Sequence, residues 1–223
     1  MTFAILGFCR DTGQAGIALT TSSIAVGARC PFVRAGVGAV ATQNVTDPRL
    51  GPRMLDAMGA GAAPAEAVSA LMDEPNIQHR QLLAIDVSGR TAAFSGTETL
   101  GVFALSEGTS CVAGGNLLDN TDVPAAMTAA FEATTGILAE RLLAALAAGL
   151  VAGGEAGSIH SAALKIADRE AWPYVDLRLD WTNGDPVAEL AGLWAEYAPQ
   201  AADYVTRGLD PLAAPSYGVP GDE

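Results

Sequence analysis

The sequence predicts an α+β fold in which two mainly antiparallel sheets lie between layers of helices. Three observations support this prediction: strand-like segments come in clusters joined by turns, helix-like segments come in pairs, and the strict alternation that a parallel sheet needs is absent. The chain has 223 residues, of which 50% are hydrophobic, so it can bury one large core. We therefore expect a single domain over residues 1–207 and a Pro/Gly-rich tail over residues 208–223.

The first part of the chain predicts strands. Residues 2–9 form a short apolar run, and residues 10–13 supply a turn in which Asp and Gly accept the required backbone angles. Residues 17–24, rich in β-branched side chains, and residues 37–42 form two further runs. Consecutive runs of this kind indicate a sheet that begins with a hairpin.

Helix signals follow, and strands then return. Asp47 and Pro48 suit the N-cap and first position of a helix that stops near Gly59, and Pro64 opens a shorter helix. Residues 81–87 and 90–94 predict a hairpin around a Ser-Gly turn. Residues 101–105 and 110–113 predict two more strands.

The last third predicts a helical pair, two strands and a final helix. Pro124 opens the pair, and Gly136 interrupts it before an apolar stripe from Leu138 to Leu146. A glycine-rich connection over residues 149–157 leads to paired strands at residues 161–167 and 174–181 and to a helix over residues 186–197.

Composition excludes several classes of function. The net charge of −13 argues against binding to nucleic acid or to an anionic membrane surface. Three cysteines without a CxxC motif and two histidines argue against a disulfide framework, a metal site and a Ser-His-Asp triad. The most apolar stretch contains Glu132, Glu140 and Arg141 and is a poor membrane span, and no signal peptide is evident, so we expect a cytoplasmic protein.

Thr2 is the main candidate nucleophile. Removal of Met1, which is usual before a small residue, would expose the hydroxyl of Thr2 beside its own α-amine. An α-amine has an ordinary pKa of about 7.7–8.0, so it can accept the hydroxyl proton without a histidine. Thr is also a common second residue in proteins that have no such chemistry.

Four residues could assist Thr2. A cation at Arg34 would keep the amine neutral, although Arg34 also suits the surface end of a strand. Thr42, Gln43 and Asn44 precede a helix, where backbone or side-chain amides could stabilise an oxyanion, although the same residue types are natural in turns and caps.

Further polar residues are candidates for substrate binding. Gly115 and Asn116 combine close backbone approach with an amide side chain, which also suits a tight turn. Ser161 begins a strand and could place a hydroxyl near the site. Asp176 and Arg178 share one face of a strand, where they could bind a polar substrate or pair on the surface.

These residues belong to a pattern that resembles a prokaryotic family called the domain of unknown function 1028. The resemblance extends from Thr2 to about Tyr197, and the run over residues 34–43 is its most specific part. Its other matching segments are residues 2–5, 25–27, 51–53, 115–116, 161–164 and 174–178.

The resemblance implies a fold and residue roles that the residues alone do not imply. The family is similar in fold to N-terminal-nucleophile (Ntn) hydrolases such as proteasome β-subunits, which implies a four-layer αββα sandwich and strengthens the hypothesis for Thr2. It also implies that Arg34 stands where proteasome-like enzymes keep a catalytic lysine.

Two functions are therefore expected. The first is a cofactor-independent, metal-free hydrolase of a small amide or peptide-like bond, with Thr2, Arg34 and Asn116 as catalytic residues. The alternative is a non-catalytic Ntn-fold protein that retains Met1 and binds a small ligand or a partner subunit. The apolar face from Leu138 to Leu146 could serve the core or the interface of a homo-oligomer.

Overall fold

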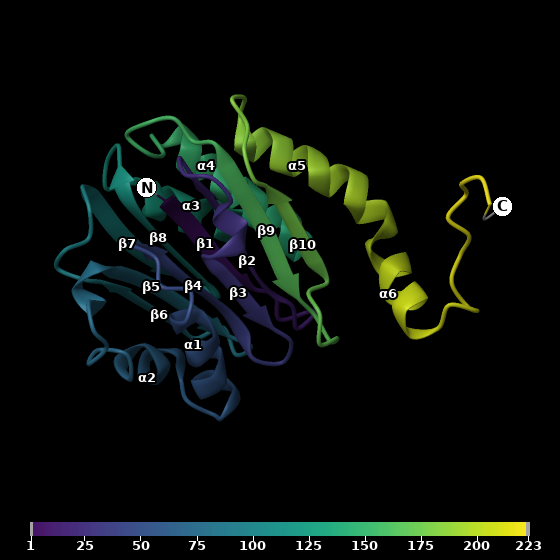
Figure 1. The fold of residues 1–223 in the computed structure, drawn as a ribbon, viewed down its shortest axis with the longest axis horizontal. Coiled ribbons are helices and arrows are strands. Elements are labelled where there is room, and N and C mark those ends of the chain that lie inside the picture. The colour runs from purple at the N-terminus through teal and green to yellow at the C-terminus, as the bar shows by residue number, and fades with distance from the viewer. Residues whose placement is uncertain (1, 222–223) are drawn as a thin grey trace.

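Strand β1 (Thr2–Phe8) lies in the middle of a six-stranded antiparallel sheet with the order β10-β9-β2-β1-β8-β7 (Figure 1). The structure is a computed structural model that describes residues 2–221. The other strands of this sheet are β2 (Ala15–Thr21), β7 (Val102–Gly108), β8 (Cys111–Leu118), β9 (Ser161–Ala167) and β10 (Val175–Leu179). A second, four-stranded antiparallel sheet contains β3 (Pro31–Arg34), β4 (Gly38–Asn44), β5 (Arg80–Asp86) and β6 (Thr91–Ser95) in that order.

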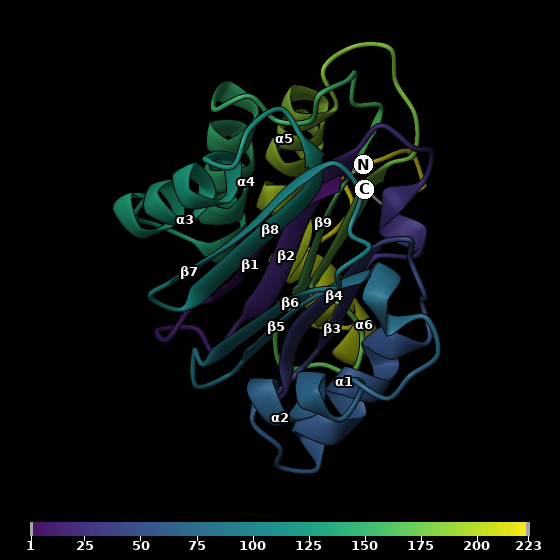
Figure 2. The same ribbon diagram turned by 90° about the vertical axis from the view of Figure 1, so that its left-hand side faces the viewer.

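Helices cover the outer face of each sheet, and the inner faces pack against each other (Figure 2). The smaller sheet packs against α1 (Leu50–Gly59) and α2 (Pro64–Ser69). The larger sheet packs against α3 (Val123–Ala133), α4 (Leu138–Val151) and α5 (Pro186–Tyr197). Helix α6 (Ala201–Leu209) continues beyond α5 and extends away from the sheets (Figure 1). In the described part of the chain, no helix is long and apolar enough to span a membrane.

Strand β1 is buried at every position because both of its faces are covered. Successive side chains of a strand point to opposite faces. Phe3 and Ile5 pack under the helices of the larger sheet, whereas Ala4 and Leu6 face the smaller sheet. This alternation places the side chain of Thr2 on the same inner face as Ala4.

Helix α3 approaches β1 closely at Gly7. A Cβ atom on Gly7 would lie 2.5 Å from the ring of Phe131, which is closer than a real contact allows. The missing side chain therefore lets the buried ring pack directly on the strand, and any larger residue would displace the helix.

The sequence predicts most elements, with local differences. The hairpin of β5 and β6, strand β9 and helix α5 are confirmed. Helix α1 begins at Leu50 rather than at Pro48, because the Asp47 carboxylate binds the backbone and guanidinium of Arg49 and holds a turn there. The Arg49 hydrogen bond is also the main cause that lowers the pKa of Asp47 to about 2.

The sequence pattern does not predict β3 or α6. Strand β3 has four residues and starts with Pro31, which lacks the backbone N–H of a regular strand residue. Helix α6 follows Pro199 and carries Gly208 in its last turn, so it resembles a loop in composition. The expected tail consequently overlaps the end of α6, and residues 222–223 lie outside the described residues.

The N-cap of α5 gives a direct test of local stability. The Asp185 carboxylate accepts hydrogen bonds from the backbone N–H groups of Val187 at 2.8 Å and Ala188 at 3.1 Å. We expect Asp185→Ala to lower the free energy of unfolding by about 1 kcal/mol, measured by chemical denaturation. Glu196→Ala, an exposed change on the same helix, is the control; an equal effect of both variants would contradict the role of the cap.

Candidate functional site

A row of polar side chains crosses the inner face of the larger sheet at one end. Ser161, Thr21, Thr2 and Asn116 lie on the neighbouring strands β9, β2, β1 and β8, and all four are buried. The strand register pairs Ser161 with Thr21 and Thr2 with Asn116. The Thr2 hydroxyl donates a hydrogen bond of 3.3 Å to the Thr21 hydroxyl. Paired residues on antiparallel strands point to the same face, so this row faces the smaller sheet.

A second polar row faces the first from the smaller sheet. Gln43, Gln81 and Ser95 lie side by side on β4, β5 and β6 in register. By strand alternation Gln43 shares the inner face with Ala41, and Gln81 shares it with Leu83. The two rows therefore replace apolar packing at this end of the space between the sheets.

The Gln81 side chain connects the two rows. Its Oε1 accepts hydrogen bonds from Gln43 Nε2 at 2.7 Å and from Asn116 Nδ2 at 3.1 Å. Its Nε2 donates to Ser95 Oγ at 2.8 Å and to the carbonyl of Gly115 at 3.0 Å. The Gln81 amide thus accepts two hydrogen bonds and donates two, all of them within the protein.

Two buried amide oxygens of this cluster lack a donor among the described residues. They are Oε1 of Gln43 and Oδ1 of Asn116. A buried acceptor without a partner costs about 1–3 kcal/mol, so such atoms are unusual in a purely structural network. Both oxygens are available to a donor group that a ligand brings.

A chain of hydroxyl groups links Thr2 to the guanidinium of Arg29. The Thr21 hydroxyl lies 3.2 Å from Ser23 Oγ, and Arg29 Nη2 donates to Ser23 Oγ at 2.6 Å. The other terminal nitrogen of Arg29 donates to the carbonyl of Ala25 at 2.9 Å and to that of Ile24. Arg29 thus fixes the segment after β2 and places a positive charge two hydroxyl groups away from Thr2.

Ser161 anchors the same segment. Its hydroxyl donates to the carbonyl of Ser23 at 2.6 Å and accepts from the backbone N–H of Val26 at 3.2 Å. The backbone N–H of Ala25 also donates to the carbonyl of Asp180 at 2.9 Å. The hydroxyl predicted to contact a substrate is therefore committed to holding the loop over the row.

Glu155 lies at the N-terminal end of β1. Both carboxylate oxygens accept from the backbone N–H of Ser22 at 3.2 Å, and its backbone forms an isolated bridge with Leu118 of β8. Its residue surface is 6% exposed. Burial raises the pKa of Glu155 from 4.5 to about 7, against the hydrogen bonds from Ser22 and the positive charge of the chain's amino terminus.

Arg34 is not part of this site. It pairs with Gly38 at the opposite end of β4 from Gln43, and its guanidinium forms an ion pair of 2.7 Å with Asp56. The expectation that Arg34 tunes Thr2 is therefore wrong. The position of Arg34 in the sequence gives no information on the direction of β3. The cation that is linked to Thr2, through the hydroxyl groups of Thr21 and Ser23, is Arg29.

The other predicted residues divide between the site and its surroundings. Gln43, Asn116 and Gly115 meet in the polar cluster. The Thr42 hydroxyl instead donates to the carbonyl of Asp47, and strand alternation directs it toward α1. Asn44 links two loops, because its amide donates to the carbonyl of His79 and accepts from Leu100.

Asp176 and Arg178 form ion pairs at the edge of the larger sheet. Asp176 pairs with Lys165 at 3.0 Å, and Arg178 pairs with Asp180 at 3.1 Å. These contacts match the structural alternative considered for both residues. Two strands, β9 and β2, also separate β10 from β1, so both residues lie apart from Thr2.

Sequence reasoning missed Thr21, Gln81, Ser23, Arg29 and Glu155. Thr21 and Gln81 carry a detectable signal, because each is a polar residue at the end of an otherwise apolar run. Ser23 and Arg29 lie in a loop, and Glu155 lies in the glycine-rich connection, where no periodicity indicates which way a side chain points. Met1, whose removal the hydrolase hypothesis needs, lies outside the described residues.

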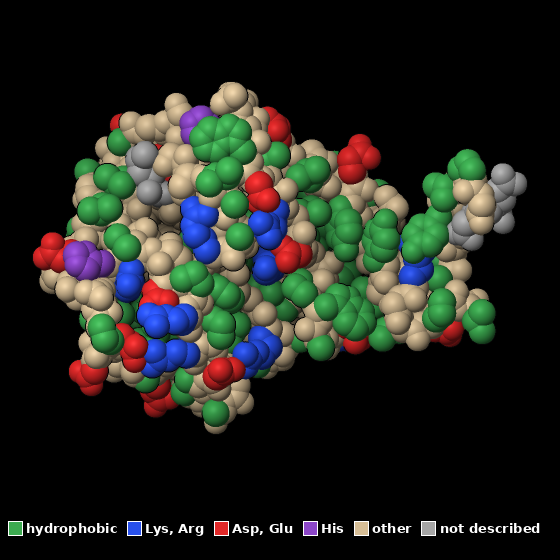
Figure 3. Space-filling view, viewed as in Figure 1, with side chains coloured by type: hydrophobic (Ala, Val, Ile, Leu, Met, Phe, Trp, Pro, Cys, Tyr) green, Lys and Arg blue, Asp and Glu red, His purple; other side chains and the backbone are tan. Residues whose placement is uncertain are grey.

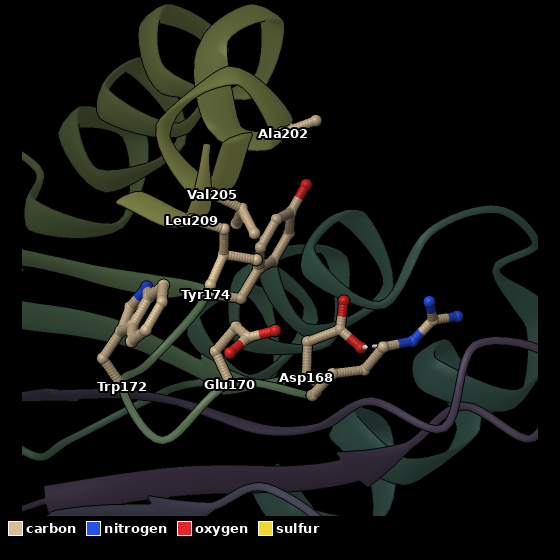
Figure 4. A pocket seen from close by; sticks show the side chains of 8 residues that line it. Asp168, Glu170, Trp172, Tyr174, Ala202, Val205 and Leu209 are labelled. Carbon is tan, nitrogen blue, oxygen red and sulfur yellow. Dashed lines mark ion pairs between the residues drawn. The ribbon is translucent and has the colours of Figure 1, made fainter. Parts of the chain in front are cut away.

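A separate cavity of about 320 Å³ lies between the end of β9 and α6. Trp172 and Tyr174 face Val205 and Leu209 there, with Asp168 nearby (Figure 4). Hydrophobic side chains also gather over α5 and α6 on the surface (Figure 3). Because β9 runs from Ser161 beside Thr21 to the residue before Asp168, this cavity is at the far end of the sheet from Thr2.

Gln81 is predicted to hold the cluster together. Gln81→Met removes an acceptor from two buried amides at nearly constant volume, so we expect the free energy of unfolding to fall by about 2 kcal/mol or more. Chemical denaturation measures this loss. Gln78→Met, an exposed change just before β5, should be nearly neutral; a neutral effect of both would contradict the role of Gln81.

Glu155 is predicted to make stability depend on pH. Unfolded Glu155 loses its proton near pH 4.5, whereas the folded protein retains it to about pH 7. Stability is thus lost as pH rises across this interval. We expect Glu155→Gln to match the wild type at pH 4.5 and to exceed it by about 3 kcal/mol above pH 7. Denaturation at both pH values, with the exposed Glu140→Gln as control, measures the difference; a constant difference would contradict it.

Comparisons with known proteins agree with this structure. Residues 2–190 match the family described as "Family of unknown function (DUF1028)". A crystal structure of a protein from Silicibacter pomeroyi, assigned to the same family, is 32% identical, with a TM-score of 0.84 over 91% of this chain and 89% of the other. No curated protein matches the chain. The chain therefore belongs to the DUF1028 family.

Proposed function

We propose that this protein is a cofactor-independent hydrolase of a small amide or peptide-like bond, with Thr2 as its N-terminal nucleophile after removal of Met1. The observation that carries the proposal is the position of Thr2. It begins the central strand of the larger sheet and faces a row of buried amide side chains. We further propose that the two sheets and their helices form the four-layer αββα sandwich of Ntn hydrolases.

The chemistry needs a base, a nucleophile and a donor for the oxyanion. The Thr2 hydroxyl would attack the carbonyl carbon while the α-amine takes the hydroxyl proton. The amine would then return this proton to the leaving amine, and water would hydrolyse the acyl-enzyme. No step requires a histidine or a metal.

Asn116 is suited to stabilise the oxyanion. A side-chain amide has two N–H donors, and Asn116 uses one of them toward Gln81. Gln43 uses its N–H groups toward Gln81 and Gly114, so it is less available. Asn116 is also the strand neighbour of Thr2, which supports a role for its second donor at the reacting carbonyl.

Arg29 takes the role that the resemblance suggested for Arg34. Its positive charge acts through Ser23 and Thr21, whose hydroxyl groups become better donors when a cation polarises them. Once Thr2 Oγ1 loses its proton, its hydrogen bond with Thr21 reverses, and the Thr21 hydroxyl donates to the negative charge that develops there. The 5% exposure of Thr2 favours a small substrate over a folded protein.

A second candidate function is ligand binding without catalysis. The cavity at α6 supports it, because its aromatic and apolar walls combine with the carboxylates of Glu170 and of Asp168, the second of which pairs with Arg169 at 4.0 Å (Figure 4). This chemistry fits a small organic molecule that carries a positive charge on an apolar body. The cavity is remote from Thr2, so this function does not depend on the removal of Met1.

The decisive test starts with the intact mass of protein purified from its native host. We expect a mass lower by one methionine residue, and hydrolysis of members of a panel of fluorogenic aminoacyl amides. Thr2→Ala should reduce turnover about 10³-fold or more, whereas Thr2→Ser should retain part of it, because only the second keeps a hydroxyl.

Thr135→Ala, an exposed change between α3 and α4, is the matched control and should leave turnover unchanged. Retention of Met1 throughout, or equal turnover in Thr2→Ala, would exclude the hydrolase mechanism. Either result would favour the binding function.

A further inference from the structure

Glu155 lies across the end of β1. Strand β1 begins at Thr2 between β2 and β8, while the chain continues past the end of β2 to Ser22 and β8 continues to Leu118. Glu155 contacts both continuations, through its carboxylate at Ser22 and its backbone at Leu118. The carboxylate is consequently at the edge where the backbone nitrogen of Thr2 would become the end of a processed chain.

The buried Glu155 carboxylate accepts from one backbone N–H group, that of Ser22. Within residues 2–221, none of the ion pairs involves Glu155. The positive charge of the amino terminus lowers the pKa of Glu155, against the larger effect of burial. A buried carboxylate of this kind is most stable beside a cation that also donates hydrogen bonds.

Charged groups on the neighbouring segments have other contacts. Arg29, on the segment after β2, uses its guanidinium for Ser23 and two backbone carbonyls. Asp119, at the end of β8, accepts from the amide of Asn120 at 3.2 Å. Arg29, the cation of the two, is thus engaged elsewhere, whereas Thr2 begins β1 beside Thr21, the residue before the Ser22 that Glu155 binds.

We propose that Glu155 is the positioning residue for the α-amine of the mature N-terminus, accepting a hydrogen bond from the amine and orienting it toward the Thr2 hydroxyl. This inference rests on the proposed function, because the amine of Thr2 exists only after Met1 is removed. It assigns Glu155 a role in holding the base and none in bonding to the substrate.

Every proton that moves in the proposed step has a donor and an acceptor. The neutral amine accepts the proton of the Thr2 hydroxyl as Oγ1 bonds to the carbonyl carbon, and Glu155 stabilises the ammonium that forms. The ammonium then gives that proton to the leaving amine as the carbon–nitrogen bond breaks. Glu155 ends the step in the state in which it began.

The test measures the titration of the amine and does not depend on turnover. A fusion protein cut by a specific protease directly before Thr2 yields the full chain with a free Thr2 amine. Acetylation with limiting acetic anhydride over a series of pH values, read by mass spectrometry of the N-terminal peptide, gives the fraction of neutral amine. The same chain unfolded in urea provides the unperturbed titration.

We expect the folded wild-type amine to react about tenfold more slowly than the amine of Glu155→Gln above pH 7, where Glu155 is ionised, because a nearby carboxylate holds the amine charged. Glutamine still accepts the Ser22 N–H, so a carboxylate that only caps this segment would give equal rates in both proteins. Glu140→Gln is the control and should titrate like the wild type.

Equal titration curves for wild type and Glu155→Gln would overturn the inference, and so would a folded wild-type curve identical to that in urea. The comparison of folded wild type with the same chain in urea tests the inference even if Glu155→Gln does not fold. Retained Met1 in the native protein would instead refute the hydrolase function. The amine titration of the cleaved chain would still be interpretable, so failure of the hydrolase function and failure of the inference on Glu155 give different results.

Discussion

The side chain of Gln81 holds the two sheets together at the end where polar residues replace the apolar core. It bonds to Gln43 in its own sheet and to Asn116 and Gly115 in the other, so its geometry fixes the distance between the two sheets there. Each of these bonds is worth only about 1 kcal/mol net, but leaving one buried partner unsatisfied costs more. The orientation of the Asn116 side chain therefore depends on an amide of the opposite sheet.

The arrangement follows from strand alternation applied to two sheets. Along β1 the residues facing the smaller sheet are Leu6, Ala4 and then Thr2, so the same period that builds the core also points the candidate nucleophile into it. Antiparallel pairing then brings Thr21 and Asn116 to its sides. Helices on the outer faces only support this geometry, because they pack against the opposite set of side chains.

Local sequence signals predict the elements well where one force dominates. Asp185 and Pro186 specify the start of α5, and the Ser-Gly turn specifies the hairpin of β5 and β6. Local signals of this kind do not specify which ends of distant strands meet. Arg34 and Gln43 are nine positions apart in one predicted cluster, yet the turn between β3 and β4 sends them to opposite ends of the sheet. Glu155 has no local signal, since its position depends on a bridge to Leu118.

The anchoring of the segment after β2 by Ser161 has a consequence for the order of synthesis. The two groups of the bond between Val26 and Ser161 are 135 residues apart in sequence, so this contact closes a long loop. A ribosome releases β1 and β2 first and the strand that carries Ser161 much later. Until that strand pairs with β2, the loop bearing Ser23 and Arg29 has no anchor on β9. A nascent chain thus carries Thr2 long before it carries the strand that completes its surroundings, and the pairing of β9 sets when the loop beside Thr21 becomes ordered.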